Sequence, residues 1–279
     1  MTLTIHDELE QGTPEWLSAR CGIVTASVVG QLISTRALTG INYPCPSCGA
    51  VADSPCMSKS RGVSDSGAPI KSIHAERVAV AAADDAPPVV EAANNDTSRS
   101  LTATLSAERI TGHVEPIFPN RAMERGTMDE PYAREVYGER YAPAIEVGFM
   151  VRQFEGFQLG YSPDGLVGDD GLIEIKSRAQ KTQLKTFLDD EVPTENMAQI
   201  QCGLLVSGRK WLDYVSYCGG MPLFVKRVYP DQEWFTAILE AAAKFEQNAE
   251  YVMSKYLTAT EGNEPTERID HFPEMELGF

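Results

Sequence analysis

Long apolar segments are missing from this chain. No run approaches the roughly 20 apolar residues that an α-helix needs to cross a bilayer, so we expect no association with a membrane. The first residues, from Met1 to Gln11, are polar and acidic, unlike the cationic and then apolar start of a secretory signal peptide. The sequence therefore predicts a protein that works in a cytoplasm.

Positive charge is also scarce. The chain has 279 residues, with 24 lysines and arginines against 40 aspartates and glutamates, and its formal net charge is −16. Proteins that coat nucleic acids without specificity are usually basic, so this chain cannot hold DNA by bulk charge. It would need a local groove, a few placed cations, or metal ions that bridge carboxylates to phosphates.

Cysteines are too few for a disulfide scaffold, with six in the whole chain. Cys45, Cys48 and Cys56 fall within twelve residues, and clustered cysteines in a cytoplasmic protein indicate a metal site. The remaining three stand among apolar neighbours, and we interpret them as inert buried thiols: they are Cys21, Cys202 and Cys218.

Three zones differ in composition: 1–37, 38–99 and 100–279. The hydrophobic content of 43% is enough for one large domain, or for one domain with a small module. The second zone holds the cysteine cluster and then, from Ala79 to Asn95, a linker rich in alanine, proline and acidic residues, with at most marginal helix. The third zone has a compact α/β pattern.

Periodicity and turn signals predict the main elements. The expected helices are 16–20, 27–34, 131–137, 194–205 with Thr194 as its cap, and a long one from Asp231 onwards. The expected strands are 156–161, 172–176, 211–217 and 223–228.

The pattern with most chemical content is Ser162-Pro163-Asp164-Gly165-Leu166, followed by Leu172-Ile173-Glu174-Ile175-Lys176. Side chains alternate along a strand, so the two isoleucines are expected to be buried. Glu174 and Lys176 then project side by side into a cleft. The Gly-Asp-Asp-Gly turn at 168–171 can fold the chain back and bring Asp164 beside Glu174.

This arrangement suits a hard divalent cation, Mg²⁺ or Mn²⁺, which takes oxygen ligands. Asp164, Glu174 and the Ile175 carbonyl would supply those ligands. The metal would polarise a phosphate and lower the pKa of a bound water, and Lys176 would orient or deprotonate that water, or offset charge on the phosphorane. An ordinary surface ion pair between Glu174 and Lys176 is the alternative interpretation, and the adjoining turn and apolar strand weigh against it.

Four patches of the sequence together carry a family resemblance. They are Trp16-Leu17-Ser18-Ala19-Arg20 running into Gly22-Ile23-Val24-Thr25-Ala26-Ser27, Arg125 to Glu130 with Ala133-Arg134, the segments around Asp164 and Glu174 given above, and Met197-Ala198-Gln199-Ile200-Gln201. Their types and order resemble the lambda-exonuclease or YqaJ-type viral recombinase family of the PD-(D/E)XK nucleases. The last patch departs from the Q-x-x-x-Y pattern of related nucleases, since Leu205 ends it here.

The resemblance implies an α/β fold of the restriction-endonuclease-like PD-(D/E)XK kind, with a central mixed sheet flanked by helices. It implies a Mg²⁺-dependent exonuclease that degrades linear double-stranded DNA from the 5′ end and leaves 3′ single strands for phage homologous recombination. A single-strand annealing protein is the implied partner, a ring-shaped homo-oligomer is common, and the host-cell cytoplasm is the location if a phage encodes the protein.

Roles at matching positions follow from the same resemblance. Asp164 and Glu174 would bind the metal, Lys176 would be catalytic, and Glu130 would complete the carboxylate cluster or hold a metal-bound water. The implied DNA contacts are Arg20 at the 5′-terminal phosphate, Ser27, Ser162, Gln199 and Gln201. From the residues alone, Arg20 is equally a surface helix residue, Ser27 a helix cap, and either glutamine a core hydrogen-bonding group.

The cysteine cluster has the spacing of a zinc site. Cys45 and Cys48 form a C-x₂-C turn, Cys56 follows after seven intervening residues and His74 after seventeen more. Zn²⁺ takes four nitrogen or sulfur ligands tetrahedrally, and this segment has little core to fold without a metal, which favours a structural zinc-binding insertion over reduced cysteines in a loop. The pattern resembles small zinc modules of phage and actinobacterial proteins, which end in His-Ala-x-Arg.

The charges of this zone leave its role open. Lys59, Arg61, Lys71 and Arg77 slightly outnumber Asp53, Asp65 and Glu76, so the module is mildly basic. DNA binding, protein docking and a purely structural role are the alternatives.

Two other readings of the whole chain compete with this one. The first is a nuclease of the RecB family or of CRISPR adaptation, with another polarity, or an endonuclease. Versions with an iron–sulfur cluster need cysteines flanking the core, where this chain has only Cys202 and Cys218. The second is a non-catalytic DNA-binding protein on the same fold, and the intact set of Asp164, Glu174 and Lys176 argues against it.

Overall fold

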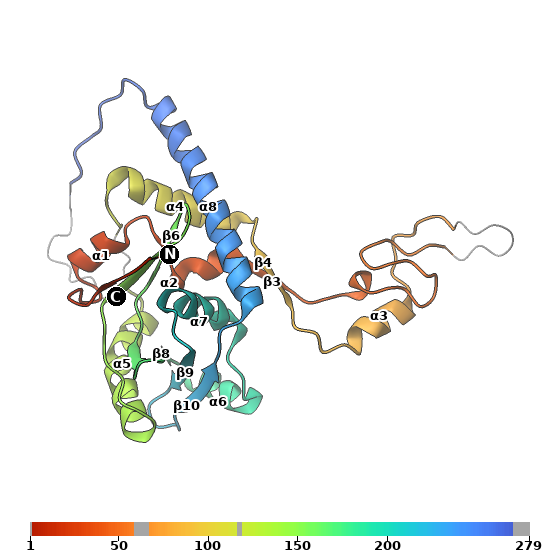
Figure 1. Cartoon of the computed structure of the whole chain (residues 1–279), viewed down its shortest axis with the longest axis horizontal. Coiled ribbons are helices and arrows are strands. Elements are labelled where there is room, and N and C mark those ends of the chain that lie inside the picture. The colour runs from red at the N-terminus through yellow and green to blue at the C-terminus, as the bar shows by residue number, and fades with distance from the viewer. Residues whose placement is uncertain (1, 59–66, 116–118, 270–279) are drawn as a thin grey trace. The chain divides into compact units, whose positions relative to one another are not determined.

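The computed structural model describes residues 2–58, 67–115 and 119–269, and the chain divides into two units. The core unit comprises Met1–Ser34 and Glu91–Phe279, and the inserted unit is Thr35–Val90, drawn in orange tones in Figure 1. The sequence places the insertion at 38–99 instead. The limits differ because residues 91–99 join the core unit, through the end of strand β4 (Val89–Ala92) and the start of helix α4 (Asp96–Thr111), which the Asn95 side chain caps.

The strands of the described residues form three sheets. Their bounds are β1 (Thr2–His6), β2 (Val24–Thr25), β3 (Ile33–Arg36), β4, β5 (Phe149–Gln153), β6 (Gln158–Tyr161), β7 (Gly165–Val167), β8 (Gly171–Ser177), β9 (Trp211–Tyr217) and β10 (Phe224–Val228). One sheet has the order β10-β9-β8-β7, the second β1-β5-β6-β2, and β3 pairs with β4. The first is mixed, because β8 and β9 are parallel while the outer pairs are antiparallel.

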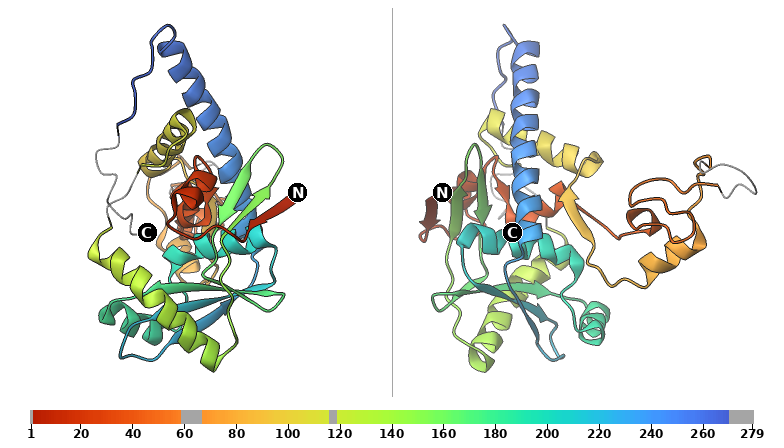
Figure 2. Two further views of the ribbon diagram at one scale, coloured as in Figure 1. Left: turned by 90° about the vertical axis from the view of Figure 1, so that its left-hand side faces the viewer. Right: turned by 45° about the vertical axis from the view of Figure 1, so that its right-hand side comes forward.

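Helices lie around these sheets, as the two views of Figure 2 show for the core unit. Their bounds are α1 (Pro14–Arg20), α2 (Ala26–Val29), α3 (Ala75–Ala82), α4, α5 (Arg121–Arg140), α6 (Gln180–Asp189), α7 (Thr194–Ser207) and α8 (Gln232–Ala259), with 3₁₀ turns η1 (Gly30–Leu32) and η2 (Gly40–Asn42). None of the helices built from the described residues is long and apolar enough to cross a membrane. The expected α/β fold, a mixed sheet flanked by helices, is confirmed.

Strand β8 buries its two isoleucines on one face, as its sequence predicts. Ile173 and Ile175 pack against Ala133 and Tyr137 of α5 in one hydrophobic cluster. The opposite face carries Glu174, which contacts α7. Burying both isoleucine side chains stabilises the fold by roughly 3–6 kcal/mol, and this burial fixes the direction in which Glu174 points.

Several local expectations are wrong, each for a physical reason. The helix expected at 27–34 ends at Val29, because the chain passes through η1 into β3. The linker expected from Ala79 to Asn95 contains the end of α3 and the strand β4, which tertiary pairing with β3 stabilises. Thr194 is inside α7 and does not cap it, since the preceding Pro193 holds the cap position and Thr194 is the first helical residue.

Candidate active site and candidate zinc site

A cleft of about 420 Å³ opens in the core unit. Its wall is built by α1, the β2–α2 junction, α5, the turn between β6 and β7, β8 and α7. Eight of the residues named from the sequence line it: Arg20, Ser27, Glu130, Ser162, Asp164, Glu174, Lys176 and Gln199. Residues that are far apart along the chain therefore meet in one place.

Asp164 lies directly before β7 and faces β8. Gly165 pairs with Ile173 in the antiparallel ladder between β7 and β8. The preceding residue, Asp164, therefore lies opposite the residue that follows Ile173, which is Glu174. Its Oδ2 atom accepts a hydrogen bond of 2.6 Å from the Ile175 amide. Burial, and then the carboxylates of Glu174 and Glu130, raise the pKa of Asp164 well above its ordinary value.

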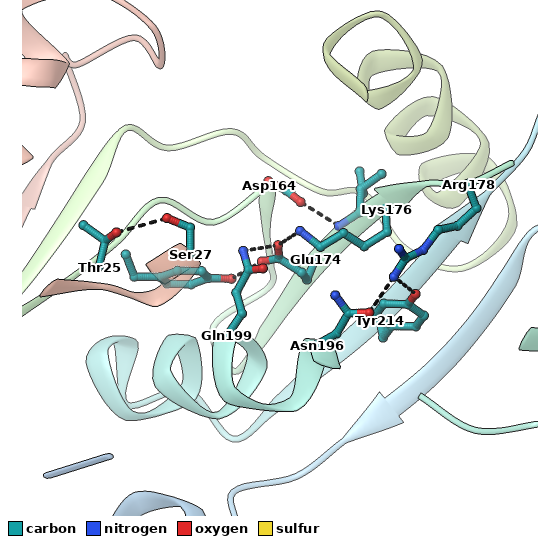
Figure 3. Close-up of polar contacts among 11 residues, drawn as sticks. Thr25, Ser27, Asp164, Glu174, Lys176, Arg178, Asn196, Gln199 and Tyr214 are labelled. Atoms are coloured by element: carbon teal, nitrogen blue, oxygen red, sulfur yellow. Dashed lines mark hydrogen bonds and ion pairs between the residues drawn. The ribbon is translucent and has the colours of Figure 1, made fainter. Parts of the chain in front are cut away.

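Glu174 is almost completely buried, with 1% of its surface exposed. Its carboxylate accepts hydrogen bonds from Lys176 Nζ at 2.7 Å and from Gln199 Nε2 at 2.5 Å (Figure 3). It also accepts one from the Tyr161 hydroxyl at 3.3 Å. Burial alone would lower the pKa of Lys176, but Glu174 and Asp164 outweigh it and raise that pKa. The lysine therefore carries a positive charge into the cleft.

Glu130 enters the cleft from α5, where it forms an ion pair with Arg134. Burial raises the pKa of Glu130, against the attraction of Arg134, and Glu174 raises it further. Arg134 also pairs with Glu146 and donates to the Asp164 carbonyl at 2.7 Å. Arg134 therefore links the Glu130 carboxylate to the backbone of Asp164. The sequence analysis included Arg134 in a family motif without giving it a role.

The three carboxylates fit a divalent cation by their chemistry. Each is an oxygen donor of the kind that Mg²⁺ and Mn²⁺ bind. Burial first, and then repulsion by neighbouring carboxylates, raise the pKa of both Asp164 and Glu130. A bound cation would relieve that repulsion.

A second group of polar side chains lies at the α1 side of the cleft. Arg20 donates from Nη2 to Thr25 Oγ1 at 3.2 Å and to Ser27 Oγ at 3.4 Å, and the two hydroxyls are 3.0 Å apart. The Arg20 guanidinium stacks 4.2 Å from the centroid of the Trp16 ring. The sequence analysis gave Thr25 no role, although the Thr-Ala-Ser motif that contains it was among the patches that carry the resemblance.

Gly22 sets the turn that brings these groups together. Its φ of +68° is in the left-handed region, and a Cβ there would lie 2.3 Å from Arg109 Cγ. The Gly22 amide donates to Glu108 at 2.8 Å and its carbonyl accepts from Arg109 at 2.7 Å. Arg109 also forms a bidentate pair with Glu246 of α8, so α4 and α8 hold the turn in place.

Of the remaining residues expected to contact DNA, two line the cleft and one is buried away from it. Ser162 lines the cleft and accepts a hydrogen bond of 2.9 Å from Trp16 Nε1. Gln199 lines it too and contacts Glu174. Gln201 is 1% exposed, and its amide bonds the carbonyl of Tyr229 and the amide of Asp231. The expected DNA contact of Gln201 is therefore wrong, because its side chain points into the core at the start of α8.

The inserted unit gathers the four expected zinc ligands. The ligand atoms of Cys45, Cys48, Cys56 and His74 all lie within 4.8 Å of one another, and Cys45 Sγ is 3.4 Å from His74 Nδ1. Backbone amides of Met57 and Ala50 lower the pKa of Cys48 to about 7. Two buried thiols, an easily ionised third and an imidazole are a donor set that Zn²⁺ prefers.

Arg77 is the structural centre of this unit. It is fully buried, and its five N–H groups are all used. They donate to the Cys56 sulfur and to four backbone carbonyls, those of Ile41, Tyr43, Val51 and Ser54. Arg77 is therefore not available to contact DNA, and the alternative of DNA binding by this unit depends on its other basic residues.

The inserted unit also lacks the basic charge expected of it. Residues 35–90 contain five basic and five acidic residues, so the charge of −16 falls on the rest of the chain. Two further expected cations, Lys59 and Arg61, lie outside the described residues together with Asp65, while Lys71 is exposed.

Comparison with known proteins agrees with this geometry. The family model described as "YqaJ-like viral recombinase domain" matches residues 74–210. Among solved structures, the alkaline exonuclease LHK-Exo from Laribacter hongkongensis is similar at 29% identity and a TM-score of 0.57, over 88% of this chain and 100% of that one. LHK-Exo in complex with dAMP is similar at 27% identity and a TM-score of 0.60, over 89% and 98% of the two chains. The curated proteins give no match.

A second family model, described as "Putative DNA-binding phage zinc finger domain", matches residues 15–93. This match and the arrangement of three cysteines and one histidine support zinc in the inserted unit. The similarity to LHK-Exo extends over most of the chain, and the YqaJ match overlaps the α5, β8 and α7 segments that build the cleft. Residues 74–210 therefore match the YqaJ-like viral recombinase domain, and most of the chain is similar to the alkaline exonuclease LHK-Exo.

Proposed function

We propose that this protein degrades one strand of linear duplex DNA from its 5′ end, with a divalent cation held by Asp164 and Glu174. The family and the alkaline exonuclease relatives support the broader class, a DNA exonuclease and hence a hydrolase. The finer assignment is carried by one observation: the carboxylate–lysine set and the Arg20 cluster open into the same cleft.

The Arg20 cluster supports the 5′ polarity. A terminal phosphate carries more negative charge than an internal phosphodiester, and a guanidinium fork with two hydroxyls can donate several hydrogen bonds to it. Burial lowers the pKa of Arg20, so an anion there would meet a poorly solvated positive charge. LHK-Exo was crystallised with dAMP, and a nucleoside monophosphate is the product that such an exonuclease releases.

The other residues of the cleft have distinct tasks. A cation bound by Asp164 and Glu174 would supply Lewis-acid polarisation of the scissile phosphate. Lys176 places a positive charge where negative charge builds up on the phosphate during attack. Gln199 and Tyr161 hold the Glu174 carboxylate in one orientation, and Arg134 holds Glu130 and the Asp164 backbone.

A biological setting follows from this activity. Degrading the 5′ strand leaves a 3′ single strand, which suits phage homologous recombination with a single-strand annealing protein as partner. We also propose a homo-oligomer and a structural role for the zinc.

End-labelled substrates test the proposal. Purified protein with Mg²⁺ is incubated with linear duplexes labelled at the 5′ or the 3′ end, with and without a 5′ phosphate. We expect early release of labelled mononucleotide from the 5′ end only, faster with the phosphate. Release from the 3′ end would refute the polarity, and cutting of circular duplex would indicate an endonuclease. The Lys176→Ala protein, purified identically, controls for a contaminating nuclease.

A further inference from the structure

Arg178 continues the row of functional side chains on β8. Glu174, Lys176 and Arg178 alternate with buried or edge residues, so they fall on the same face of the strand and its extension. The ladder continues to this point, because the Arg178 amide donates to the Tyr217 carbonyl at 2.7 Å. In the view of Figure 3, Thr25 and Ser27 lie on one side of Glu174 and Lys176, and Arg178 lies on the other.

The Arg178 guanidinium is fixed by neutral groups. Its Nη2 atom donates to the Asn196 side-chain carbonyl and to the Tyr214 hydroxyl, the latter at 3.0 Å. Asn196 and Gln199 are three residues apart on α7, so the same helix face holds Arg178 and Glu174. Both anchors are nearly or fully buried, which gives the guanidinium one orientation.

Donors of this guanidinium are left without a partner. The Nε atom is buried and forms no hydrogen bond with the described residues, and the hydrogen bonds that the described residues give Arg178 both come from Nη2. It forms no ion pair with a carboxylate of that part of the chain, although the protein carries a net charge of −16. The Nη1 atom is not among the buried unpartnered atoms of the described residues, so it is the donor that a ligand can reach, and a hydrogen bond to a charged ligand there is favourable.

We propose that Arg178 binds the phosphate that lies one nucleotide to the 3′ side of the scissile phosphate, on the strand being degraded. The inference rests on the proposed 5′ polarity. With the terminal phosphate at Arg20 and the scissile phosphate at Glu174 and Lys176, the strand continues towards Arg178. Two residues along a strand cover about 7 Å, so Arg178 is displaced from Lys176 along the path of the DNA backbone.

This position gives Arg178 a role between cycles. When the terminal mononucleotide leaves, its contacts at Arg20 are lost. The phosphate at Arg178 still ties the remaining strand to the protein until the new 5′ end moves up to Arg20. Arg178 is thus a positioning residue that sets the register of each step and retains the substrate.

DNA in which one phosphodiester linkage is replaced by an uncharged one tests the contact between Arg178 and a single phosphate. The substrates are 5′-phosphorylated linear duplexes with a single methylphosphonate either at the second linkage from the 5′ end or far from it, and single-turnover release of the first nucleotide is measured. We expect the wild type to be about tenfold slower with the neutral second linkage, as for loss of one charge-assisted hydrogen bond. The Arg178→Gln variant should be about tenfold slower on ordinary DNA and less than twofold slower again with the neutral linkage.

Two further variants separate recognition from folding. Arg178→Lys keeps the charge and should keep part of the sensitivity to the second linkage, which a purely structural arginine would not. Lys210→Gln removes one positive charge at the opposite end of β8, where Lys210 pairs with Asp170, and should behave as the wild type. Equal sensitivity of the wild type and Arg178→Gln, or no sensitivity in the wild type, would overturn the assignment while the 5′ exonuclease remains. Release from the 3′ end would overturn both.

Discussion

Replacing Asp164 by asparagine should abolish nuclease activity and, without metal, make the protein more stable at neutral pH. Asp164 and Glu174 stand opposite each other across an antiparallel pair, where side chains are about 5 Å apart. Two negative charges at that separation repel by about 3 kcal/mol at an effective dielectric constant near 20. Screening by Lys176 and solvent leaves roughly 1–2 kcal/mol. Asparagine removes the charge and keeps an oxygen that accepts the Ile175 amide hydrogen bond.

The pH dependence has a defined sign. The pKa of Asp164 is raised in the folded state, by burial first and by its acidic neighbours next, so the fold favours the protonated form. Its stabilising contribution is complete below the unfolded pKa near 4 and is lost as the pH rises through the folded pKa. The difference in melting temperature between the variant and the wild type should therefore be small near pH 4 and grow towards pH 8, to roughly 2–8 °C.

Thermal unfolding with chelator, and then with Mg²⁺ or Mn²⁺, measures both effects. Metal should raise the melting temperature of the wild type, since a ligand at 100 times its Kd stabilises a protein by about 2.7 kcal/mol. The melting temperature of the Asp164→Asn variant should not change when metal is added. Asp170→Asn is the matched control, because it removes the same charge from an exposed position paired with Lys210. A variant that is less stable than the wild type without metal, or that keeps the metal response, would refute the electrostatic reasoning.

Four further results are expected. Lys176→Ala should lose about 10²- to 10⁴-fold in single-turnover rate yet keep the Mg²⁺-dependent rise in melting temperature, and loss of that rise would make the lysine part of metal binding. Arg20→Ala should reduce the preference for 5′-phosphorylated over 5′-hydroxyl ends by about tenfold, whereas an unchanged preference would leave Arg20 a structural residue. Cys48→Ser should lose one zinc per chain by elemental analysis and expose the inserted unit to protease, while the melting of the core unit stays the same; Arg77→Lys, which cannot replace five donors, should weaken zinc retention without removing a ligand.

Much of the site could be predicted because its signals are local. Alternation along β8 requires Ile173 and Ile175 to share one face, and Glu174 and Lys176 the other. The turn before β8 limits where Asp164 can be. The spacing of Cys45, Cys48 and Cys56 likewise restricts the chain to a tight metal-binding turn. These inferences depend on backbone periods and short loops, which the residue types themselves dictate.

The direction of long polar side chains could not be read in this way. Gln199 and Gln201 are two residues apart on one helix, and only packing against Glu174 and against the start of α8 distinguishes the cleft residue from the core residue. Arg77 is one of the basic residues of its zone, yet it is buried, because the surrounding loops turn four carbonyls towards it. The roles of these long side chains depend on which groups from remote parts of the sequence the fold brings next to them.

The sequence by itself determined the α/β class, the carboxylate–lysine strand and the set of zinc ligands, because hydrophobic periods and ligand spacings act over a few residues. Tertiary structure decided that Arg20 meets the carboxylates in one cleft, that Arg134 links Glu130 to the Asp164 backbone, and that Arg178 keeps donors without partners. Each of these arises from contacts between segments far apart along the chain, whose approach is set by the packing of the whole core.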